Sequence, residues 1–190
     1  GSGQTYCLLN SLRVNQQGEL LGIITNLGLF HVNWKDHVIE NRMPEMNSIL
    51  QTSITDFYQD KNLNYWICSS TDGLIFVRPD GKGFRNWTGK DGLPSNTLTR
   101  MESTNDRHLW ISTISGLCRF DTKTYETVNF NHRDGLPSNE FNERVSAIIS
   151  DGRILFGSLA GFTLIDPLKA NTDTRQPEVV ISDISFQNQS

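Results

Sequence analysis

A hexapeptide that occurs twice constrains the fold of this 190-residue chain more than any other feature. The sequence Asp-Gly-Leu-Pro-Ser-Asn begins at Asp91 and again at Asp134, an offset of 43 residues. A period of this length is typical of proteins that repeat one small supersecondary unit, each copy packing against its neighbours. The chain is therefore expected to be a tandem array of such units.

A second motif recurs in the same register. It consists of an apolar strand, a short turn and a glycine followed by an apolar residue. Its glycines are Gly28, Gly73, Gly116 and Gly161, at spacings of 45, 43 and 45 residues. Such spacings fall in the range of β-propeller blades, roughly 40–50 residues each. The chain is predicted to be all-β, with about four four-stranded antiparallel meanders in a partial propeller.

The third copy shows how one blade is expected to run. Its four strand-like segments are residues 97–101, 109–113, 117–120 and 125–130. The second is mostly apolar, as in strands buried on both faces, and the fourth alternates as an outer strand does. Glycine at 116 suits the hairpin turn between the second and third strands. The hexapeptide, rich in turn-forming residues, then leads to the next blade.

The fourth copy departs from this pattern. Strand-like segments cover 145–149, 154–158 and 162–165, but a polar stretch follows where an outer strand is expected. A new strand-like segment covers 177–186. The predicted domains are 1–3, which reads as a cloning scar, 4–168, the blades, and 169–190, a linker and the first strand of a β-sandwich module.

Other classes of protein lack support in the sequence. No segment has the helical periodicity of helical repeats, and none of the four tryptophans is followed by the aspartate of WD40 repeats. A net charge of −4 without a cluster of Lys and Arg argues against nucleic-acid binding. No stretch approaches the roughly 20 apolar residues of a membrane helix, so no membrane segment is expected.

Cysteines and histidines form no pattern of a metal or disulfide site. The three cysteines, an odd number, lack paired zinc-ligand spacings. Cys68 and Cys118 lie in apolar runs and are expected to be buried thiols. The four histidines, His31, His37, His108 and His132, are scattered. No metal or other cofactor is expected.

Tryptophans are the candidates for ligand binding. Trp66 and Trp110 lie on the second strands of adjacent blades, where packing between blades is favoured over a sugar-stacking platform. Trp34 and Trp87 lie on later, more polar strands and are the candidate ligand-binding residues, although packing explains them equally simply. The side chains expected in the core are Ile67, Leu74, Trp110, Ile111, Leu117, Phe120, Leu155 and Phe156.

No catalytic residues are predicted. Asp91 and Asp134 open the same turn, and aspartate favours turns because it accepts hydrogen bonds from nearby backbone amides. A catalytic acid–base pair needs two different environments, whereas these aspartates occupy two copies of one environment. Nucleotide-binding and hydrolase motifs are also absent from the sequence.

The motifs resemble a known family. The hexapeptide loop, followed by the paired strands that run from Leu109 through Gly116 to Phe120, resembles the two-component regulator propeller repeat. The resemblance covers about residues 11–166. That repeat forms the periplasmic part of hybrid two-component sensors in Bacteroides-type bacteria, and the segment from Pro177 resembles the start of the immunoglobulin-like module that follows it.

The resemblance implies a non-catalytic periplasmic segment of an inner-membrane-anchored sensor. It would sense oligosaccharides or other glycan breakdown products and signal to a histidine kinase outside this chain. Its expected partners are an oligosaccharide and the rest of the same sensor protein. Two alternatives stay open: a propeller-type polysaccharide lyase or glycosidase, and a purely structural protein-interaction scaffold. An enzyme should carry unmatched acid, base or metal residues on one face, whereas these interblade loops are near copies of each other.

Self-association of the chain is also expected. Propellers protect their blade faces by closing into a ring, and the propellers of that family have about seven blades. Four blades would leave two apolar faces open, and monomers rarely expose such area. The chain is predicted to stack its end blades or to exchange a strand such as 179–186. The alternative is a closed four-bladed ring.

Overall fold

The computed structural model describes residues 9–24, 28–33, 35–36, 38–41, 54–81 and 83–170, the side chain of Arg144 excepted. Its strands form four antiparallel meanders in chain order, so the predicted all-β blades are confirmed. Blade 1 contains β1 (Leu9–Val14), β2 (Leu20–Ile24), β3 (Gly28–Asn33) and β4 (Val38–Asn41). Blade 2 contains β5 (Ile54–Gln59), β6 (Tyr65–Ser69), β7 (Leu74–Val77) and β8 (Phe84–Trp87). Blade 3 contains β9 (Leu98–Glu102), β10 (His108–Thr113), β11 (Gly116–Asp121) and β12 (Thr127–Phe130). Blade 4 contains β13 (Phe141–Ile148), β14 (Ile154–Ser158) and β15 (Gly161–Ile165).

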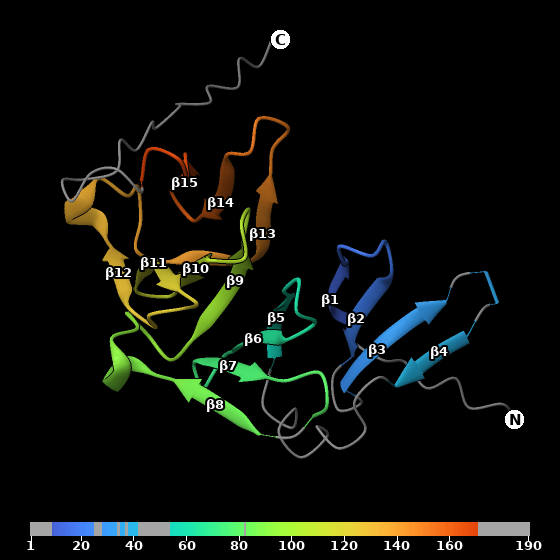
Figure 1. The fold of residues 1–190 in the computed structure, drawn as a ribbon. Coiled ribbons are helices and arrows are strands. Elements are labelled where there is room, and N and C mark those ends of the chain that lie inside the picture. Colours follow the sequence, from blue (N-terminus) through green and yellow to red (C-terminus); the bar gives the residue numbers. More distant parts are fainter. Residues whose placement is uncertain are drawn as a thin grey trace, which may run out of the picture.

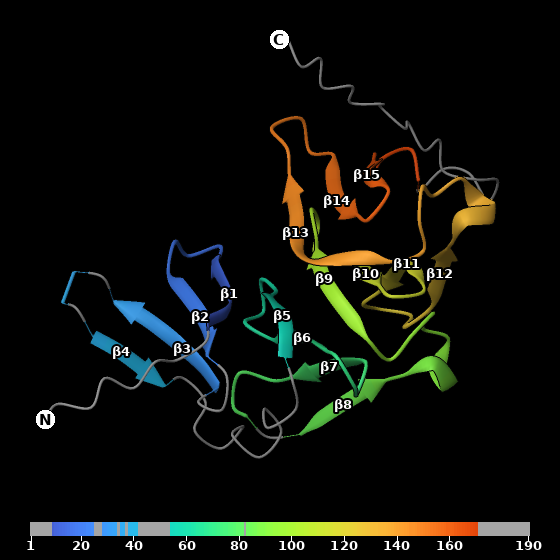
Figure 2. The same cartoon turned by 180° about the vertical axis from the view of Figure 1, so that it is seen from behind.

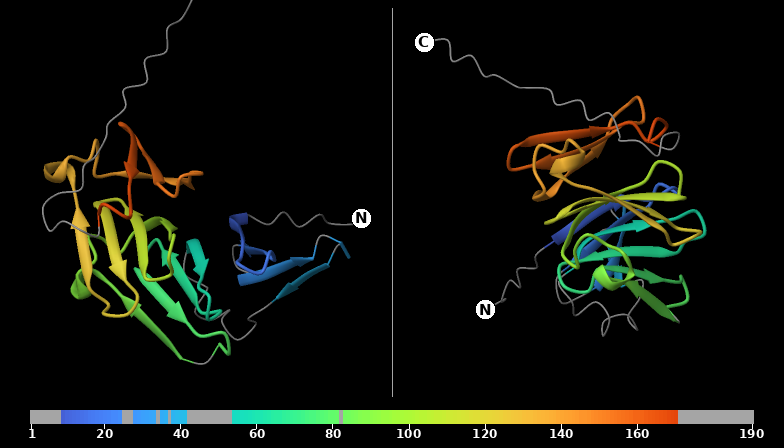
Figure 3. Two further views of the ribbon diagram at one scale, coloured as in Figure 1. Left: turned by 45° about the horizontal axis from the view of Figure 1, so that its top comes forward. Right: turned by 90° about the vertical axis from the view of Figure 1, so that its left-hand side faces the viewer.

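The four blades lie side by side in an arc, with their first strands innermost (Figure 1). The inner strands β1, β5, β9 and β13 face the centre of the arc, and the outer strands β4, β8 and β12 lie on its periphery. Blades 1 and 4 are the two ends of the arc, as the view from behind also shows (Figure 2). In side view successive sheets lie face to face (Figure 3). The described residues thus form a partial propeller and not a closed four-bladed ring.

Blade 4 differs from the others in the described part of the chain. Its sheet has three strands among the described residues, and the polar stretch predicted in place of an outer strand extends beyond them. β13 begins at Phe141, before the predicted start at 145, because the strand continues past an irregularity in its pairing with β14. The predicted linker and the strand at 177–186 lie outside the described residues.

The repeated hexapeptide joins the blades and also fills the space between them. Gly89–Asp91 and His132–Asp134 form single 3₁₀ turns, each N-capped by the residue before it. The leucine of each copy, Leu93 or Leu136, is buried among the side chains of a blade interface. The hexapeptide is therefore a turn that carries one core residue.

The glycine of the second motif is required by a close contact. Gly116 has a φ of 121°, and a Cβ at this position would lie 2.3 Å from the carbonyl oxygen of Phe130. Its backbone N–H donates to the carbonyl oxygen of Asn139, the last hexapeptide residue, at 2.7 Å. Gly73 contacts the outer strand of blade 2 and the hexapeptide that follows this blade in the same way. The two sequence motifs recur together because one docks on the other.

Apolar side chains fill the three interfaces between successive blades. The predicted core residues Ile67, Leu74, Trp110, Ile111, Leu117, Phe120 and Phe156 are buried. Leu155 is the least buried of the predicted set, with a partly exposed side chain. Leu155 follows Trp110 by one repeat, on the face that a following blade would cover. Blade 4 has no following blade among the described residues.

The outer faces of the two end blades are apolar. Each face carries one row of side chains that cross-strand pairing aligns across the sheet. The rows consist of Val14, Leu20, Val32 and Ile39 in blade 1 and of Ala147, Leu155 and Leu164 in blade 4. Val14 is 68% exposed and Ile39 is 57% exposed. These surfaces have the composition of a blade interface and face solvent.

Candidate functional site

The two candidate tryptophans give no exposed aromatic surface in the described structure. Trp34 lies outside the described residues. Trp87 lies at the end of β8 and is 2% exposed. Its ring centroid is 5.7 Å from that of Trp66 and 5.1 Å from those of Phe120 and Tyr125. The indole is enclosed by other rings, so packing describes its surroundings.

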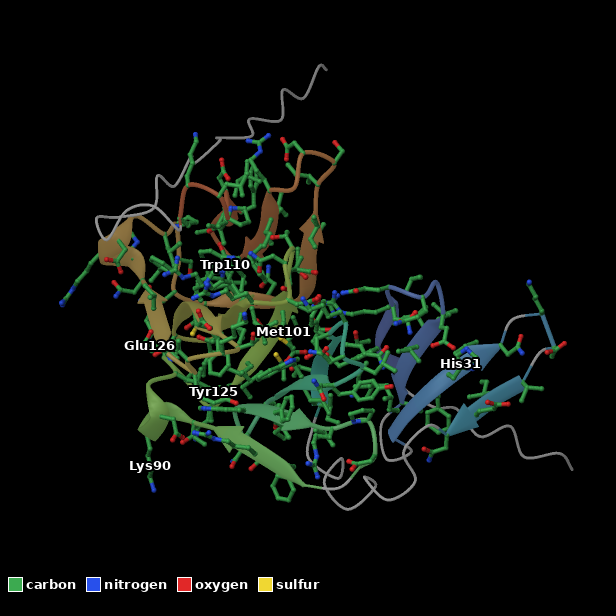
Figure 4. All side chains as sticks on the ribbon, viewed as in Figure 1. His31, Lys90, Met101, Trp110, Tyr125 and Glu126 are labelled. Atoms are coloured by element: carbon green, nitrogen blue, oxygen red, sulfur yellow. The ribbon has the colours of Figure 1, made fainter. Side chains whose placement is uncertain are left out.

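Trp66 and Trp110 are buried between blades, as predicted from their strands. The indole N–H of Trp66 donates to Asp60 Oδ2 at 3.3 Å. Trp110 lies between blades 3 and 4, stacked on Phe130 with 5.9 Å between ring centroids (Figure 4). Both rings hold adjacent sheets together and present no face to a ligand.

The repeated aspartates are structural. The Asp91 carboxylate accepts hydrogen bonds from the backbone N–H of Thr88 at 2.9 Å and from its hydroxyl at 3.0 Å. Asp134 accepts from the backbone N–H of Asn131 at 2.9 Å in the same capping box. The bond from the Thr88 backbone, and next that from its hydroxyl, lower the pKa of Asp91.

Cysteines and histidines provide no metal centre in the described residues. Burial raises the pKa of the Cys118 thiol to about 12 and that of Cys68 well above its usual value, so both are buried, protonated thiols. Cys7 and His37 lie outside the described residues. Within the part of the chain that the structure describes, no three His, Cys, Asp or Glu side chains are grouped to hold a metal ion.

Polar side chains line the axis of the arc at matching positions of the inner strands. One set consists of Ser11, Asp56, Arg100 and Ser146, at spacings of 45, 44 and 46 residues, and the other of Arg13, Tyr58 and Glu102, at spacings of 45 and 44. Because the inner strands converge on the axis, positions one repeat apart in the sequence become neighbours in space.

Asp56 is the centre of this axial cluster, and its side chain has no solvent exposure. Its carboxylate accepts from the Ser11 hydroxyl at 2.7 Å, from Arg13 Nε at 3.1 Å and from the backbone N–H of Met101 at 2.9 Å. Arg100 Nη1 lies 3.2 Å away. Figure 4 shows Met101 near the middle of the arc. A buried carboxylate is tolerated only when it is paired and hydrogen-bonded, and here the two neighbouring blades, 1 and 3, supply the partners.

Arg13 extends the cluster to all four blades. Its Nη1 donates to Glu102 Oε2 at 2.9 Å, and the Ser146 hydroxyl donates to the other oxygen of Glu102 at 2.7 Å. Burial opposes the charge of Arg13, but attraction to Asp56 and the bonds to both carboxylates outweigh it, so the pKa of Arg13 is raised. The guanidinium stays charged and fully engaged.

A cavity of about 310 Å³ opens beside the axial cluster, where β1, β5 and β9 end and the turns after them begin. Its polar wall includes Arg13, Asn15, Gln16, Tyr58, Glu102 and Asp106. Its apolar wall includes Val14, Leu21, Phe57 and Ile148. All four blades contribute to this axial pocket, so its shape depends on how the inner strands are arranged.

Asp106 is held at the rim of the axial pocket by two donors. The Tyr58 hydroxyl and Gln16 Nε2, the latter at 3.1 Å, both donate to Asp106 Oδ1. Burial, and then the bond to Asp106, raise the pKa of Tyr58, which therefore remains a neutral hydrogen-bond donor. Asp106 has a φ of 57°, a conformation that aspartate tolerates better than most residues.

Sequence reasoning missed both the axial cluster and the axial pocket. The repeat is visible in the sequence through its glycines and its hexapeptide, neither of which lies on the inner strands. The signal that could have found the cluster is the set of charged and hydroxyl residues in the middle of each first strand, spaced by about one blade.

Sequence comparison matches about half of this chain to part of a histidine kinase. "Histidine kinase P4" of Formosa agariphila is 26% identical over 100 residues, which is 53% of this chain and 7% of that protein. No family model matches the chain. Within the described residues, no helix has the length and apolar character needed to cross a membrane.

Solved structures share the arrangement of blades. An extracellular domain assigned to a hybrid two-component system of B. thetaiotaomicron matches with a TM-score of 0.68 and 19% identity, over 96% of this chain and 25% of that domain. The chain has the propeller fold of this sensor domain. The predicted resemblance to Bacteroides-type two-component sensor regions is therefore confirmed.

Enzymes also use this fold. Virginiamycin B lyase of Staphylococcus aureus matches with a TM-score of 0.65 and 14% identity, over 98% of this chain and 59% of the lyase. At such identities the likeness establishes the fold alone. The chain spans about a quarter of the length of the two-component domain, which is 25% covered.

Proposed function

We propose that this chain is a non-catalytic, periplasmic segment of a hybrid two-component sensor, part of a protein anchored in the inner membrane. It binds an oligosaccharide or another glycan breakdown product. The signal passes to a histidine kinase that lies outside this chain. The rest of the same sensor protein is its main partner.

The observation that carries this proposal is the sequence identity to a histidine kinase, in a chain with the fold of a two-component extracellular domain. Two independent comparisons, one of sequence and one of structure, lead to proteins of the same signalling class. The axial pocket adds a concave polar surface to which a small ligand can bind.

A lyase or glycosidase is the second candidate, favoured by the fold of virginiamycin B lyase. The interblade loops do not support an enzyme. Their aspartates, Asp91 and Asp134, are both engaged in capping boxes with the residues that precede the turn. A general acid or base must instead reach the substrate.

The test has two arms. Melting of the purified chain is measured with a panel of neutral and acidic oligosaccharides, and autophosphorylation of the full-length sensor is measured with and without each oligosaccharide that raises the melting temperature. A binding oligosaccharide should change kinase activity and be recovered intact. A melting temperature that no oligosaccharide raises, or release of shortened sugar products, contradicts the proposal.

The apolar end faces support a further proposal, that the chain self-associates. Light scattering should give a mass above the 21.5 kDa of one chain that rises with protein concentration. Ile39→Glu places a charge on the outer face of blade 1 and should lower this mass. Val38→Glu, at an exposed neighbour on the opposite face of the same strand, is the control. A mass of one chain at every concentration contradicts self-association.

A further inference from the structure

We propose that the axial pocket is the site of ligand binding, and that its ligand is a small neutral sugar of one or two rings and not an acidic one. This inference rests on the proposed function and adds to it a place in the fold, a ligand charge and a set of contacts. Trp87 is not among the residues that line this pocket.

The size of the axial pocket limits the ligand. At about 310 Å³ it lies near the lower end of the roughly 300–1,000 Å³ range of small-molecule sites. Long polysaccharide chains do not fit such an enclosed volume, whereas a terminal sugar ring or a disaccharide does. The site therefore suits a breakdown product more than an intact polymer.

The polar wall offers both kinds of hydrogen-bonding group. Carboxylate oxygens of Asp106 and Glu102 can accept, and the exposed side-chain amide of Gln16 can donate. A sugar hydroxyl is donor and acceptor at once, so it can use both kinds of group. Hydrogen bonds to a carboxylate are charge-assisted and are about twice as strong as neutral ones.

The apolar wall complements the ring of a sugar. Leu21, Phe57 and Ile148 line the pocket, as does the half-buried Tyr58. Pockets that combine apolar walls with a few placed polar groups are typical of ligand sites. A sugar ring has an apolar C–H face and a polar rim, which match the two walls.

The charges in the axial pocket exclude an acidic ligand. Arg13 is the one cation among its lining residues, and it faces the carboxylates of Asp56 and Glu102. Two carboxylates, Glu102 and Asp106, line the pocket itself. A uronate or sulfate group would meet net negative charge and find the guanidinium already engaged.

Asp106 is the contact that the structure holds in place most specifically. Its backbone carbonyl accepts from the Thr122 hydroxyl at 2.9 Å, and its carboxylate accepts from Tyr58 and Gln16. The matching turn positions of blades 1 and 4 are taken by Gly18 and Gly152, which have no side chain to offer. Among the described turns that follow the inner strands, this one contributes a carboxylate to the wall of the axial pocket.

The test uses isothermal titration of the chain with maltose, cellobiose, xylobiose and mannobiose, and with digalacturonate as the acidic probe. At least one neutral disaccharide should bind and digalacturonate should not. Asp106→Asn keeps the shape of the side chain and removes its charge, and it should weaken binding tenfold or more. Gln16→Ala, at an exposed position, should weaken binding severalfold.

The control is Asp151→Asn. Asp151 lies in the corresponding turn of blade 4, is exposed and is not part of the axial pocket. The Asp151→Asn variant should bind the neutral disaccharide as tightly as the unmodified chain does. If Asp106→Asn melts at a lower temperature, Gln16→Ala decides the outcome, because Gln16 is exposed and is not part of the buried core.

The outcomes separate the two proposals. If a neutral disaccharide binds and neither Asp106→Asn nor Gln16→Ala weakens its binding, the axial pocket is not the site. The sensor proposal is then unaffected. Binding of digalacturonate alone overturns the ligand class assigned here, again without loss of the sensor proposal. If no probe binds here and the wider panel also leaves melting unchanged, both proposals fail together.

Discussion

Removing Trp110 should destabilise the chain more than any other single truncation at the interface of blades 3 and 4. The side chain is 1% exposed and stacks on Phe130. A buried tryptophan removes about 150–250 Å² from water, which at about 25 cal/mol per Å² amounts to roughly 4–6 kcal/mol. Partial burial in the unfolded chain reduces this by roughly 10–40%. We expect Trp110→Ala to cost about 3–5 kcal/mol, the usual range for such truncations.

Chemical denaturation followed by circular dichroism measures this cost. In a thermal melt the same change should lower the midpoint by roughly 6–20 °C, since 1 kcal/mol corresponds to about 2–4 °C in a chain of this size. The matched control is Leu155→Ala, one repeat later on the uncovered face of blade 4, which should cost about 1 kcal/mol or less. Equal costs at the two positions would show that blade 4 does not cover Trp110, and the assignment of this interface would be wrong.

Three further changes test other parts of the structure. Asp56→Ala should cost about 3–5 kcal/mol by leaving buried cations unpaired, whereas Asp151→Ala, at an exposed position, should leave the free energy of unfolding nearly unchanged. Similar small effects of both changes would contradict the axial cluster. Gly116→Ala should lower the free energy of unfolding, measured by chemical denaturation, more than Gly152→Ala does. Both glycines have a positive φ, but only at Gly116 would the new Cβ collide with a carbonyl oxygen. The lowered pKa of Asp91 means that its contribution to stability is complete above the ordinary carboxyl pKa of 3.8 and is lost as the pH falls through the folded value. Stability curves of the unmodified chain and of Asp91→Asn should therefore converge at acid pH, and parallel curves would refute this.

The architecture was accessible from the sequence because local signals repeat. The hexapeptide and the hairpin glycine are each tied to a backbone requirement, as the contact between Gly116 and Phe130 shows. Such requirements are met by the same residues in successive copies, so the period could be measured directly. The strand at 154–158 coincides with β14 for the same reason.

The burial of individual side chains was less accessible because it depends on neighbours outside the repeat. Trp110 and Leu155 occupy the same position in successive copies, yet one is enclosed and the other partly exposed. Trp87 has polar neighbours in the sequence, but its own ring turns inward. The local sequence pattern predicts which face of its sheet a side chain lies on. It does not predict whether another sheet covers that face.

The axial pocket was the least accessible feature, since it is assembled from residues far apart in the chain. Arg13 and Glu102 are 89 positions apart and meet only because blades 1, 2 and 3 curve around a common axis. Sequence motifs detect short-range chemistry. A site with one contact from each blade leaves no motif, only a polar residue in the middle of each first strand.

The bond between Arg13 and Glu102 changes how this array should unfold. In a linear repeat protein each unit contacts only its neighbours, so the terminal units can open first. Here the loss of blade 1 would leave Glu102, two blades away, without its counterion and beside the buried Asp56 carboxylate. The separation of blade 1 from the array is therefore opposed by the ion pairs that it forms with blades 2 and 3. Backbone amides of β1, β5 and β9 should exchange with solvent in a single cooperative step, so that three blades behave as one thermodynamic unit.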